Sequence, residues 1–354
     1  MSLSNQATAL VSSYPRVELG HFPTPLERMA NLGADFGIDN LWVKREDCSG
    51  LAFGGNKVRP LEFYLGAAAG AKADTVMITG AVQSNFMRTT AAAAAKLGLD
   101  CHVQLEDRVS DTDEIYQRSG NVLLDRIFGA KFHHFPEGED EVAADRQVNK
   151  LAAELSAAGR RPFVIPLAAD QPPLGALGYV LCAGEILAQA ARDGIDFDHV
   201  VVASGSGLTH GGLLVGFRAL GRDDIRVQAM CVRRDADSQR QRMRRRAAMI
   251  ADLIGHDSLI DEADLLINDR CFPPSYGKLN AATQAAIAAF ARSEGLLLDP
   301  VYSGKVAAGM MHMAAAGDFA HAKGVIFIHT GGQPALFAYE PALTTAYTKM
   351  DNGS

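Results

Sequence analysis

The sequence predicts an α/β fold built on parallel sheets. From Asp39 onward, short β-rich runs alternate with Ala-rich segments of helical period, as in LWVKRED, LEFYLGAAAGAKA, TVMIT, FMRTTAAAAAKLG and CHVQLED. The same alternation returns in RPFVIPL, LGYVLCAGEILAQAARDG, HVVVASG and GVIFIHTGG, so it covers nearly the whole chain. Strands that alternate with helices pair in parallel, because each helix carries the chain back across the sheet.

The length and composition indicate a globular protein with two lobes. A chain of 354 residues exceeds the usual size of one compact core, so we expect two packed domains, although one large α/β domain would also fit. Hydrophobic residues make up 48% of the chain and charged residues 21%. This composition supplies enough apolar surface for a core and argues against disorder.

The charge and cysteine content argue against several classes of partner. The formal net charge of -7 offers no overall attraction to nucleic acid or to an anionic membrane. Five widely spaced cysteines without a CxxC pair fit neither a disulfide framework nor a zinc site, which favours a reducing compartment and no metal. The start of the chain lacks a basic segment followed by a long apolar run, so we expect no export signal, no membrane anchor and a cytoplasmic location.

One segment departs from this acidic balance. The run VRRDADSQRQRMRRRAA is strongly basic from Arg233 to Arg246. It could bind the phosphates of a nucleic acid, but it has no interleaved aromatic residues on which the bases would stack. We therefore interpret it as the solvated face of a helix.

Four loops that follow predicted strands have an unusual composition: SGLAFGGNKVRPLE, GAVQSN, SGSGLTHGG and HTGGQPALF. Ligands of open α/β folds bind at the carboxyl ends of strands. SGSGLTHGG, Ser204 to Gly212, combines glycines that allow close backbone approach with hydroxyl donors and the start of a predicted helix. This loop predicts a phosphate-binding cup without a nucleotide-binding GxGxxG or GxxxxGK[ST] pattern; the alternative is a glycine turn required only by packing.

Three other loop residues are candidates for chemistry. Lys57 of GGNK stands at the start of a predicted helix near Arg59, where a lysine has a lowered pKa and can serve as a Schiff-base nucleophile; the alternative is a solvated lysine without a catalytic role. A phosphorylated aldehyde cofactor needs both such a lysine and a phosphate cup. Ser84 of QSN is either a functional hydroxyl or only a helix N-cap. Tyr302, in the loop after Pro300, is either an acid/base group or a core residue.

Taken together, these motifs resemble one family, the fold-type II pyridoxal-phosphate enzymes. The resemblance is to the branch that contains D-cysteine desulfhydrase, 1-aminocyclopropane-1-carboxylate deaminase and L-cysteate sulfo-lyase. It runs from FPTPLE near Phe22 to FAYEP near Pro341. Its marks, in the family's order, are VKREDCSGLAFGGNKVRPLE, QSN, GNVLLDRIFGA, LGALGYV, SGSGLTHGG, the SYG around Tyr276, LLLDPVYSGK and HTGGQPALFAY.

The resemblance implies a tryptophan synthase β-like fold with two open, mostly parallel sheets and flanking helices. It implies a large cofactor-binding domain of residues 1–59 and 168–354, and a small domain of residues 60–167, with pyridoxal 5'-phosphate between them. It also implies a homodimer, since members of the family are commonly homodimers.

The resemblance assigns roles to individual residues. It implies that Lys57 is the Schiff-base lysine, that Asn85 bonds the cofactor's 3'-oxygen and that Thr330 meets the pyridine nitrogen. A neutral hydroxyl at that nitrogen makes the ring a moderate electron sink, which suits β-elimination. The residues that would wrap the phosphate are Ser204, Gly205, Ser206, Gly207, Leu208 and Thr209. Those that would face the substrate as catalytic residues, besides Lys57, are Ser84, Tyr276 and Tyr302.

The implied reaction is a β-elimination from a small amino acid that yields pyruvate and ammonia, with Lys57 or a tyrosinate taking the Cα proton. The first candidate is a D-cysteine desulfhydrase-like lyase that releases sulfide, the next an L-cysteate sulfo-lyase that releases sulfite. Ring-opening deamination is a third candidate, weakened because Ser303 stands where the deaminases have Glu. A cofactor-binding regulatory protein is the non-enzymatic alternative.

Three features of the sequence depart from the pattern of the branch and concern the substrate. Ala168 to Gln171 replace a GGSN-like turn, and Phe86 replaces the histidine that usually follows QSN. Lys278 takes a place that is usually apolar, where it is either a solvated lysine or an attractor of a sulfonate or carboxylate.

Overall fold

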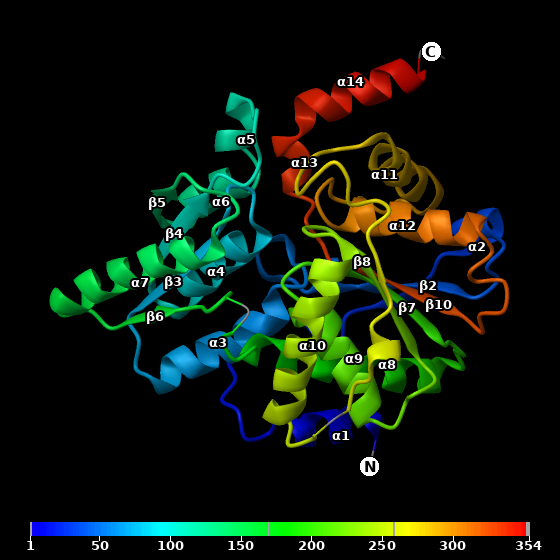
Figure 1. The fold of residues 1–354 in the computed structure, drawn as a ribbon, viewed down its shortest axis with the longest axis horizontal. Helices are drawn as coiled ribbons and strands as arrows, with labels where there is room; N and C mark the ends of the chain where they lie inside the picture. The colour runs from blue at the N-terminus through cyan, green and yellow to red at the C-terminus, as the bar shows by residue number, and fades with distance from the viewer. Residues whose placement is uncertain (1, 169, 258, 352–354) are drawn as a thin grey trace.

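The computed structural model describes residues 2–168, 170–257 and 259–351, and it contains two separate sheets (Figure 1). The larger sheet has the order β1 (Leu26–Arg28), β2 (Leu41–Arg45), β10 (Val325–His329), β7 (His199–Ser204), β8 (Arg226–Cys231) and β9 (Ile267–Asn268). The smaller sheet has the order β5 (Lys131–Phe135), β4 (Asp100–Glu106), β3 (Thr75–Ala81) and β6 (Pro162–Val164). All neighbouring strands are parallel except β1, which runs antiparallel to β2. The predicted α/β class with two open, mostly parallel sheets is therefore confirmed.

Helices cover both sheets. Those before β7 are α1 (Leu3–Leu10), α2 (Ala30–Phe36), α3 (Val58–Gly70), α4 (Asn85–Leu97), α5 (Glu114–Arg118), α6 (Asn121–Ile127), α7 (Glu141–Ala157) and α8 (Leu177–Asp193). Those after it are α9 (Leu208–Ala219), α10 (Ala236–Leu253), α11 (Ala281–Glu294), α12 (Ser303–Ala315), α13 (Ala335–Ala338) and α14 (Glu340–Asp351). Short 3₁₀ turns are η1 (Glu46–Cys48), η2 (Leu51–Phe53), η3 (Leu174–Ala176) and η4 (Glu262–Asp264).

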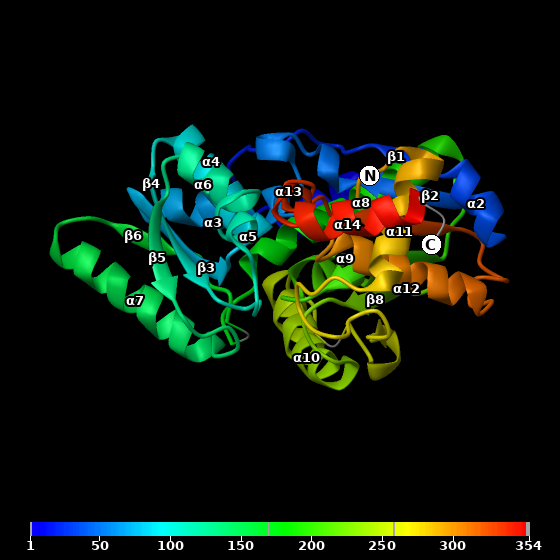
Figure 2. The ribbon, with the colours of Figure 1, turned by 90° about the horizontal axis from the view of Figure 1, so that it is seen from above.

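The smaller sheet and helices α4 to α7 form a lobe beside the rest of the molecule, as both ribbon views show (Figures 1 and 2). Its strands fall inside residues 60–167, and the strands of the larger sheet fall outside that range. Helix α3 packs against α4 and also against α8. The exact domain boundaries stay a prediction.

Local sequence explains where the helices that carry site residues begin and end. Ser84 caps α4, since its side chain accepts a hydrogen bond from the backbone of Met87. Asp235 caps α10 in the same way. Helices α4 and α8 end at Gly98 and Gly194, both in the left-handed conformation that glycine adopts without strain.

The strands that lead into the site are buried on both faces. Every residue of β3 and of β10 is buried, which matches their continuous apolar sequence. The segment Leu174–Asp193 is long and apolar enough to cross a membrane, but 72% of its most apolar 18-residue stretch is buried inside the fold. Its composition is therefore explained by its place in the core.

A buried ionic network joins β2, α3 and α8. The carboxylate of Glu46 is fully buried and accepts hydrogen bonds from Arg59 Nε at 2.6 Å and from the Tyr179 hydroxyl at 2.9 Å. Arg59 also bonds Glu185 at 2.9 Å, and Lys44 bonds the same carboxylate. Burial raises the pKa of Glu46, but Arg59, with smaller contributions from Lys44 and Thr24, outweighs this effect and holds the pKa at about 2.

Replacing Arg59 should destabilise the fold strongly. Arg59→Met leaves Glu46 buried without its main partner, so we expect a loss of about 3–5 kcal/mol in the free energy of unfolding, measured by urea denaturation. The matched control is Arg118→Met, whose exposed ion pair with Glu114 should contribute little.

This loss should depend on pH. The folded pKa of Glu46 lies below its ordinary value of 4.5, so its stabilisation is fully present above pH 4.5 and disappears as the pH falls toward 2. The difference between Arg59→Met and the parent should shrink over the same range. Equal unfolding midpoints for the parent, Arg59→Met and Arg118→Met at neutral pH would contradict the prediction.

Candidate active site

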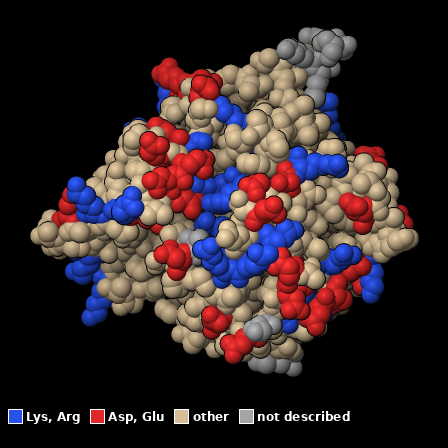
Figure 3. All heavy atoms as spheres, in the orientation of Figure 1, with Lys and Arg blue, Asp and Glu red and all other residues tan. Residues whose placement is uncertain are grey.

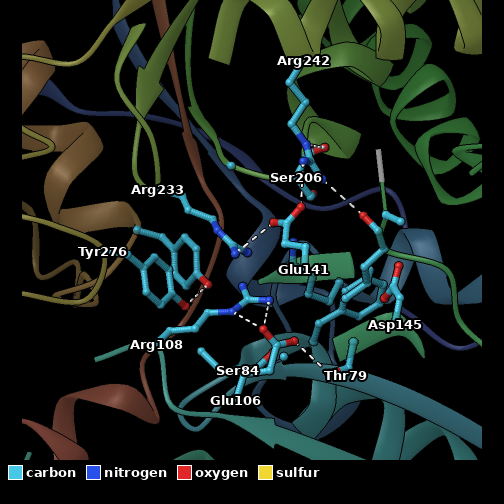
Figure 4. A pocket seen from close by; sticks show the side chains of 18 residues that line it. Thr79, Ser84, Glu106, Arg108, Glu141, Asp145, Ser206, Arg233, Arg242 and Tyr276 are labelled. Atoms are coloured by element: carbon cyan, nitrogen blue, oxygen red, sulfur yellow. Dashed lines mark hydrogen bonds and ion pairs between the residues drawn. The ribbon is translucent and has the colours of Figure 1, made fainter. Parts of the chain in front are cut away.

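Two cavities meet at Lys57, between the carboxyl ends of the strands of the two sheets. The first cavity (Figure 4) is lined by Lys57, Thr79, Gly80, Ala81, Ser84, Phe86, Glu106, Arg108, Glu141, Asp145, Leu167, Ala168, Gly205, Ser206, Arg233, Arg242, Tyr276 and Tyr302. The second is lined by Asn56, Lys57, Asn85, Ala203, Gly205, Ser206, Gly207, Thr209, Val232, Tyr302 and Thr330. Nearly all the residues singled out from the sequence therefore lie around one place.

Lys57 is the residue immediately before α3, one position earlier than a helix start at Arg59 would imply. Its Nζ lies 5.3 Å from the centroid of the Phe86 ring. Burial lowers the pKa of Lys57 to about 8, and in the part of the chain that the structure describes no acidic group opposes that shift. Lys57 is thus an amine with a substantial unprotonated fraction at mildly alkaline pH.

The turn before Lys57 requires glycine. Gly54 has φ +63°, and a Cβ added to it would lie 2.1 Å from the carbonyl oxygen of Asp47. The next residue but one, Asn56, connects this turn to two other predicted loops. Its side-chain nitrogen donates to Thr209 Oγ1 at 2.8 Å, and its backbone nitrogen donates to the carbonyl of Thr330 at 2.9 Å. Sequence reasoning quoted Asn56 within GGNK but gave it no role.

The glycine-rich loop SGSGLTHGG lies between β7 and α9. Gly207, with φ +90°, precedes the first helical residue, so the helix N-terminus faces the second cavity. Gly205, Ser206, Gly207 and Thr209 line that cavity. The Ser204 hydroxyl is instead buried, where it lies 3.0 Å from His210 Nδ1 and accepts from Gln239 at 2.8 Å. Leu208 is also buried.

Ser84 and Asn85 open onto different cavities. Ser84 caps α4 and also lines the first cavity. Its hydroxyl is therefore a helix N-cap that is also placed where it can contact a ligand. Asn85 lines the second, and its Oδ1 accepts a hydrogen bond from Asn121 Nδ2 at 3.1 Å. Because Asn121 occupies that oxygen, Asn85 keeps its amide N–H groups for a partner in the cavity. Asn121 itself, within GNVLLDRIFGA, was not singled out from the sequence.

Two tyrosine hydroxyls meet on the wall of the first cavity. The hydroxyls of Tyr276 and Tyr302 lie 2.6 Å apart, and the two rings are in an edge-to-face arrangement. Burial raises the pKa of both phenols. Each is therefore a neutral hydroxyl at physiological pH, able to donate a proton or pass one to the other.

The basic run was interpreted wrongly at several positions. Arg246 is only 2% exposed and donates to the carbonyls of Ala168 and Gln171 at 2.7 and 2.8 Å. Arg242 contacts the Ser206 carbonyl, and Arg233 lines the first cavity. The signal that could have found this is the helical spacing of positions 242 and 246, which share the face of α10 that packs inward with Met243 and Ile250.

The other departures from the branch pattern have mixed outcomes. Lys278 is not among the cavity-lining residues; its Nζ bonds the Ser110 carbonyl instead. Ala168 lines the first cavity, and Asp170 and Gln171 line a neighbouring cavity to which Ala168 also belongs. Ala169 is outside the described residues. Phe86 lies beside the Lys57 amine.

The described residues hold no cluster of His, Cys, Asp or Glu suited to a metal ion, and each cysteine is a free thiol. The second cavity combines an amine, hydroxyls, amide N–H groups and a helix N-terminus. That set of groups fits a phosphorylated aldehyde with hydrogen-bonding ring substituents.

A family model described as "Pyridoxal-phosphate dependent enzyme" matches residues 17–331. The chain belongs to this family. A 1-aminocyclopropane-1-carboxylate deaminase of Burkholderia multivorans is 41% identical over 330 residues, which cover 92% of this chain and 96% of the relative. A D-cysteine desulfhydrase of Serratia proteamaculans is 41% identical over 331 residues, covering 94% and 98%. The predicted membership of the pyridoxal-phosphate enzymes, and with it the cofactor, is confirmed.

Two solved structures agree with the fold. An "ACC deaminase homologue" superposes with a TM-score of 0.86 at 34% identity, covering 96% of this chain and 98% of that one. O-ureido-L-serine synthase, at 18% identity and a TM-score of 0.60 over 94% of both chains, shares the fold alone. The predicted fold type is confirmed.

The glycine before α9 should matter for cofactor affinity. Gly207→Ala places a Cβ 2.8 Å from Met243 Sδ on a left-handed backbone, so the loop must shift or strain. We expect roughly tenfold weaker binding of pyridoxal phosphate to the apoprotein, followed by absorbance titration. Gly221→Ala is the matched control, since its φ is +72° with no atom within 4 Å of the added Cβ. Equal affinities in the two variants would refute this role of the loop.

Proposed function

We propose that this pyridoxal-phosphate enzyme is a lyase that removes the Cα proton and the β-substituent of a small amino acid. With D-cysteine, the first candidate, the balanced reaction consumes water and yields pyruvate, ammonia and hydrogen sulfide. The observation that carries the proposal is the position of Lys57, where the two cavities meet, with the paired Tyr276 and Tyr302 hydroxyls on the wall of one of them.

The cofactor would occupy the second cavity. Lys57 would hold its aldehyde carbon, Asn85 its 3'-oxygen and Thr330 its ring nitrogen. The phosphate would be held by the loop residues that line the cavity, Gly205, Ser206, Gly207 and Thr209. These roles are supported by the cavity lining, by the bond from Asn121 that orients Asn85 and by the start of α9 beside the loop. When bound, pyridoxal phosphate supplies an electron-withdrawing ring that stabilises negative charge at Cα.

The chain's own groups would move the protons. Once the substrate amine has replaced it at the aldehyde carbon, Lys57 Nζ, whose pKa burial lowers to about 8, would take the Cα proton. The substrate carboxylate would lie at Ser84, where the N-terminus of α4 favours negative charge. The Tyr276 and Tyr302 pair would hold a proton near the departing sulfur, since burial keeps both hydroxyls protonated.

Ring-opening deamination is less well supported. The two relatives named as a deaminase and a desulfhydrase have equal identity, so their names do not decide. Ser303, the first residue of α12, is fully buried, and its hydroxyl donates to Asp299 Oδ1 at 2.6 Å. This position therefore supplies no carboxylate to the cofactor ring. A purely regulatory role is opposed by the complete set Lys57, Ser84 and Tyr302 around the cavity.

We also propose a cytoplasmic homodimer that acts on a small amino acid and binds neither nucleic acid nor membrane. The acidic balance of the chain, with a formal net charge of -7, supports the absence of polyanionic partners. The homodimer rests on the family resemblance of the sequence.

Lys57→Ala should abolish the covalent link to the cofactor. We expect the purified variant to lack the visible absorbance band of the parent when supplied with pyridoxal phosphate, and to lose turnover. Lys278→Ala is a control lysine outside the cavities, and it should keep the band. A parent-like band in Lys57→Ala would show that another lysine holds the cofactor.

A product screen should identify the reaction. We expect the holoenzyme to release pyruvate from D-cysteine, L-cysteate or both, and to release no 2-oxobutyrate from 1-aminocyclopropane-1-carboxylate. Coupled lactate dehydrogenase assays measure each product, with L-cysteine and 3-chloro-D-alanine as further substrates. Release of 2-oxobutyrate alone would replace the lyase proposal with ring-opening deamination.

A further inference from the structure

Two arginines from different lobes face each other on the first cavity. Arg108 follows β4 of the smaller sheet, and Arg233 follows β8 of the larger one. Both side chains are only 11% exposed and both line the cavity that contains Lys57. Figure 4 shows them pointing toward one another beside Tyr276. Two guanidiniums are thus buried together at the wall of the proposed substrate site.

The carboxylates around them do not balance the charge. Glu106 accepts from Arg108 Nε at 2.6 Å. Glu141, the first residue of α7, is shared by three guanidiniums, those of Arg233 at 2.9 Å, of Arg242 at 3.1 Å and of Arg234. Four guanidiniums therefore share two carboxylates. In the space-filling view a blue patch lies at the middle of this face between red groups (Figure 3).

One more acid lines the cavity and only partly offsets this excess. Asp145 makes no ion pair with any described residue, and burial together with Glu106 and Glu141 raises its pKa to about 6. The pKa of Arg233 is lowered, first by burial and then by the positive charge of Arg108. A buried pair of like charges is unfavourable unless an anion lies between or beside them.

The position of the pair connects it to the reacting atoms. The Tyr276 hydroxyl, which feels the charges of both arginines, lies 2.6 Å from that of Tyr302. Tyr302 in turn lines both cavities together with Lys57. A ligand whose amine lies at Lys57 and whose carboxylate lies at Ser84 would extend its side chain along this wall.

We propose that Arg108 and Arg233 form a subsite for an acidic group on the substrate's side chain, a sulfonate, phosphonate or carboxylate. The inference rests on the proposed function and refines its substrate class. Guanidinium groups match the geometry of such oxyanions through paired N–H donors. Glu141 holds Arg233 when no acid is bound, so the internal carboxylate and the ligand compete for the same guanidinium.

Isothermal titration calorimetry of the holoenzyme tests this with ligands that lack an amine and so cannot react. The acids are 3-sulfopropanoate, 3-phosphonopropanoate and succinate. The isostere of the first is 4,4-dimethylpentanoate, which keeps the carboxylate and carries an uncharged tert-butyl group in place of the sulfonate. We expect the parent to bind at least one acid roughly tenfold or more tightly than the isostere. The ranking of the three acids identifies the preferred group.

Variants separate a binding role from a structural one. Arg233→Gln and Arg108→Gln should each reduce the ratio of acid to isostere affinity roughly tenfold, and Arg233→Lys should restore part of it. Glu141→Gln should strengthen acid binding, because it removes the competing carboxylate. Arg244→Gln is the matched control on α10, since this exposed arginine pairs with Glu262 away from the cavity.

The outcomes distinguish this inference from the proposed function. Equal affinity of the parent for acids and isostere, no acid binding at all, or weaker acid binding in Glu141→Gln overturns the subsite even if D-cysteine is converted to pyruvate. Selective acid binding that requires Arg233 supports the subsite even if the product screen fails. Thermal unfolding of each variant, compared with the parent, shows whether a lost affinity reflects a lost fold.

Discussion

The buried carboxylate of Glu46 is the constraint on which the geometry around Lys57 depends. It lies just after β2, and it holds Arg59, two residues beyond Lys57. The Tyr179 hydroxyl from α8 lies within hydrogen-bonding distance of both Glu46 and the Asn56 carbonyl, at 2.9 and 3.2 Å. Both sides of the lysine turn are thereby fixed to the larger sheet. A buried, paired charge of this kind favours one arrangement, because any shift would leave it unpaired.

Close packing of α8 on the start of α3 makes that network possible. A Cβ on Gly178 would lie 2.7 Å from the backbone of Arg59, and one on Gly175 would lie 2.5 Å from the Tyr64 ring. The small residues of LGALGYV are therefore explained by backbone approach and need no contact with a ligand. The same motif supplies Tyr179. A segment with the sequence of an ordinary apolar helix therefore packs against the turn before Lys57 and also donates a hydrogen bond to its Asn56 carbonyl.

The sequence predicted the fold and the neighbourhood of the site because both follow from local patterns. Alternating β and α segments place the loop ends of parallel strands together, so Lys57, Asn85 and Thr330 converge without any knowledge of contacts. Ser204 shows the limit of this reasoning. Ser204 belongs to a loop whose composition is typical of phosphate binding. Its hydroxyl instead contacts His210 and Gln239 in the core, and these contacts depend on how α9 and α10 pack.

The charged wall was missed for a different reason. Arg108, Glu141 and Arg233 are far apart in the chain and meet only where the two lobes meet, so no spacing within one segment indicates their contact. The basic run, judged alone, is typical of a solvated helix, and its exposed members Arg244 and Arg245 fit that interpretation.

The two cavities differ in how they satisfy charge, and this difference explains why glutamates line only one of them. The second cavity presents neutral donors and a helix N-terminus, which suit a phosphate that remains bound to the protein. The first cavity is the proposed substrate site, which is empty between turnovers. The positive charge of its guanidiniums must therefore be partly compensated by the protein itself. Glu106 and Glu141 supply that partial compensation. Even with Asp145, the carboxylates are fewer than the four guanidiniums, and this imbalance is the basis of the proposed acid subsite.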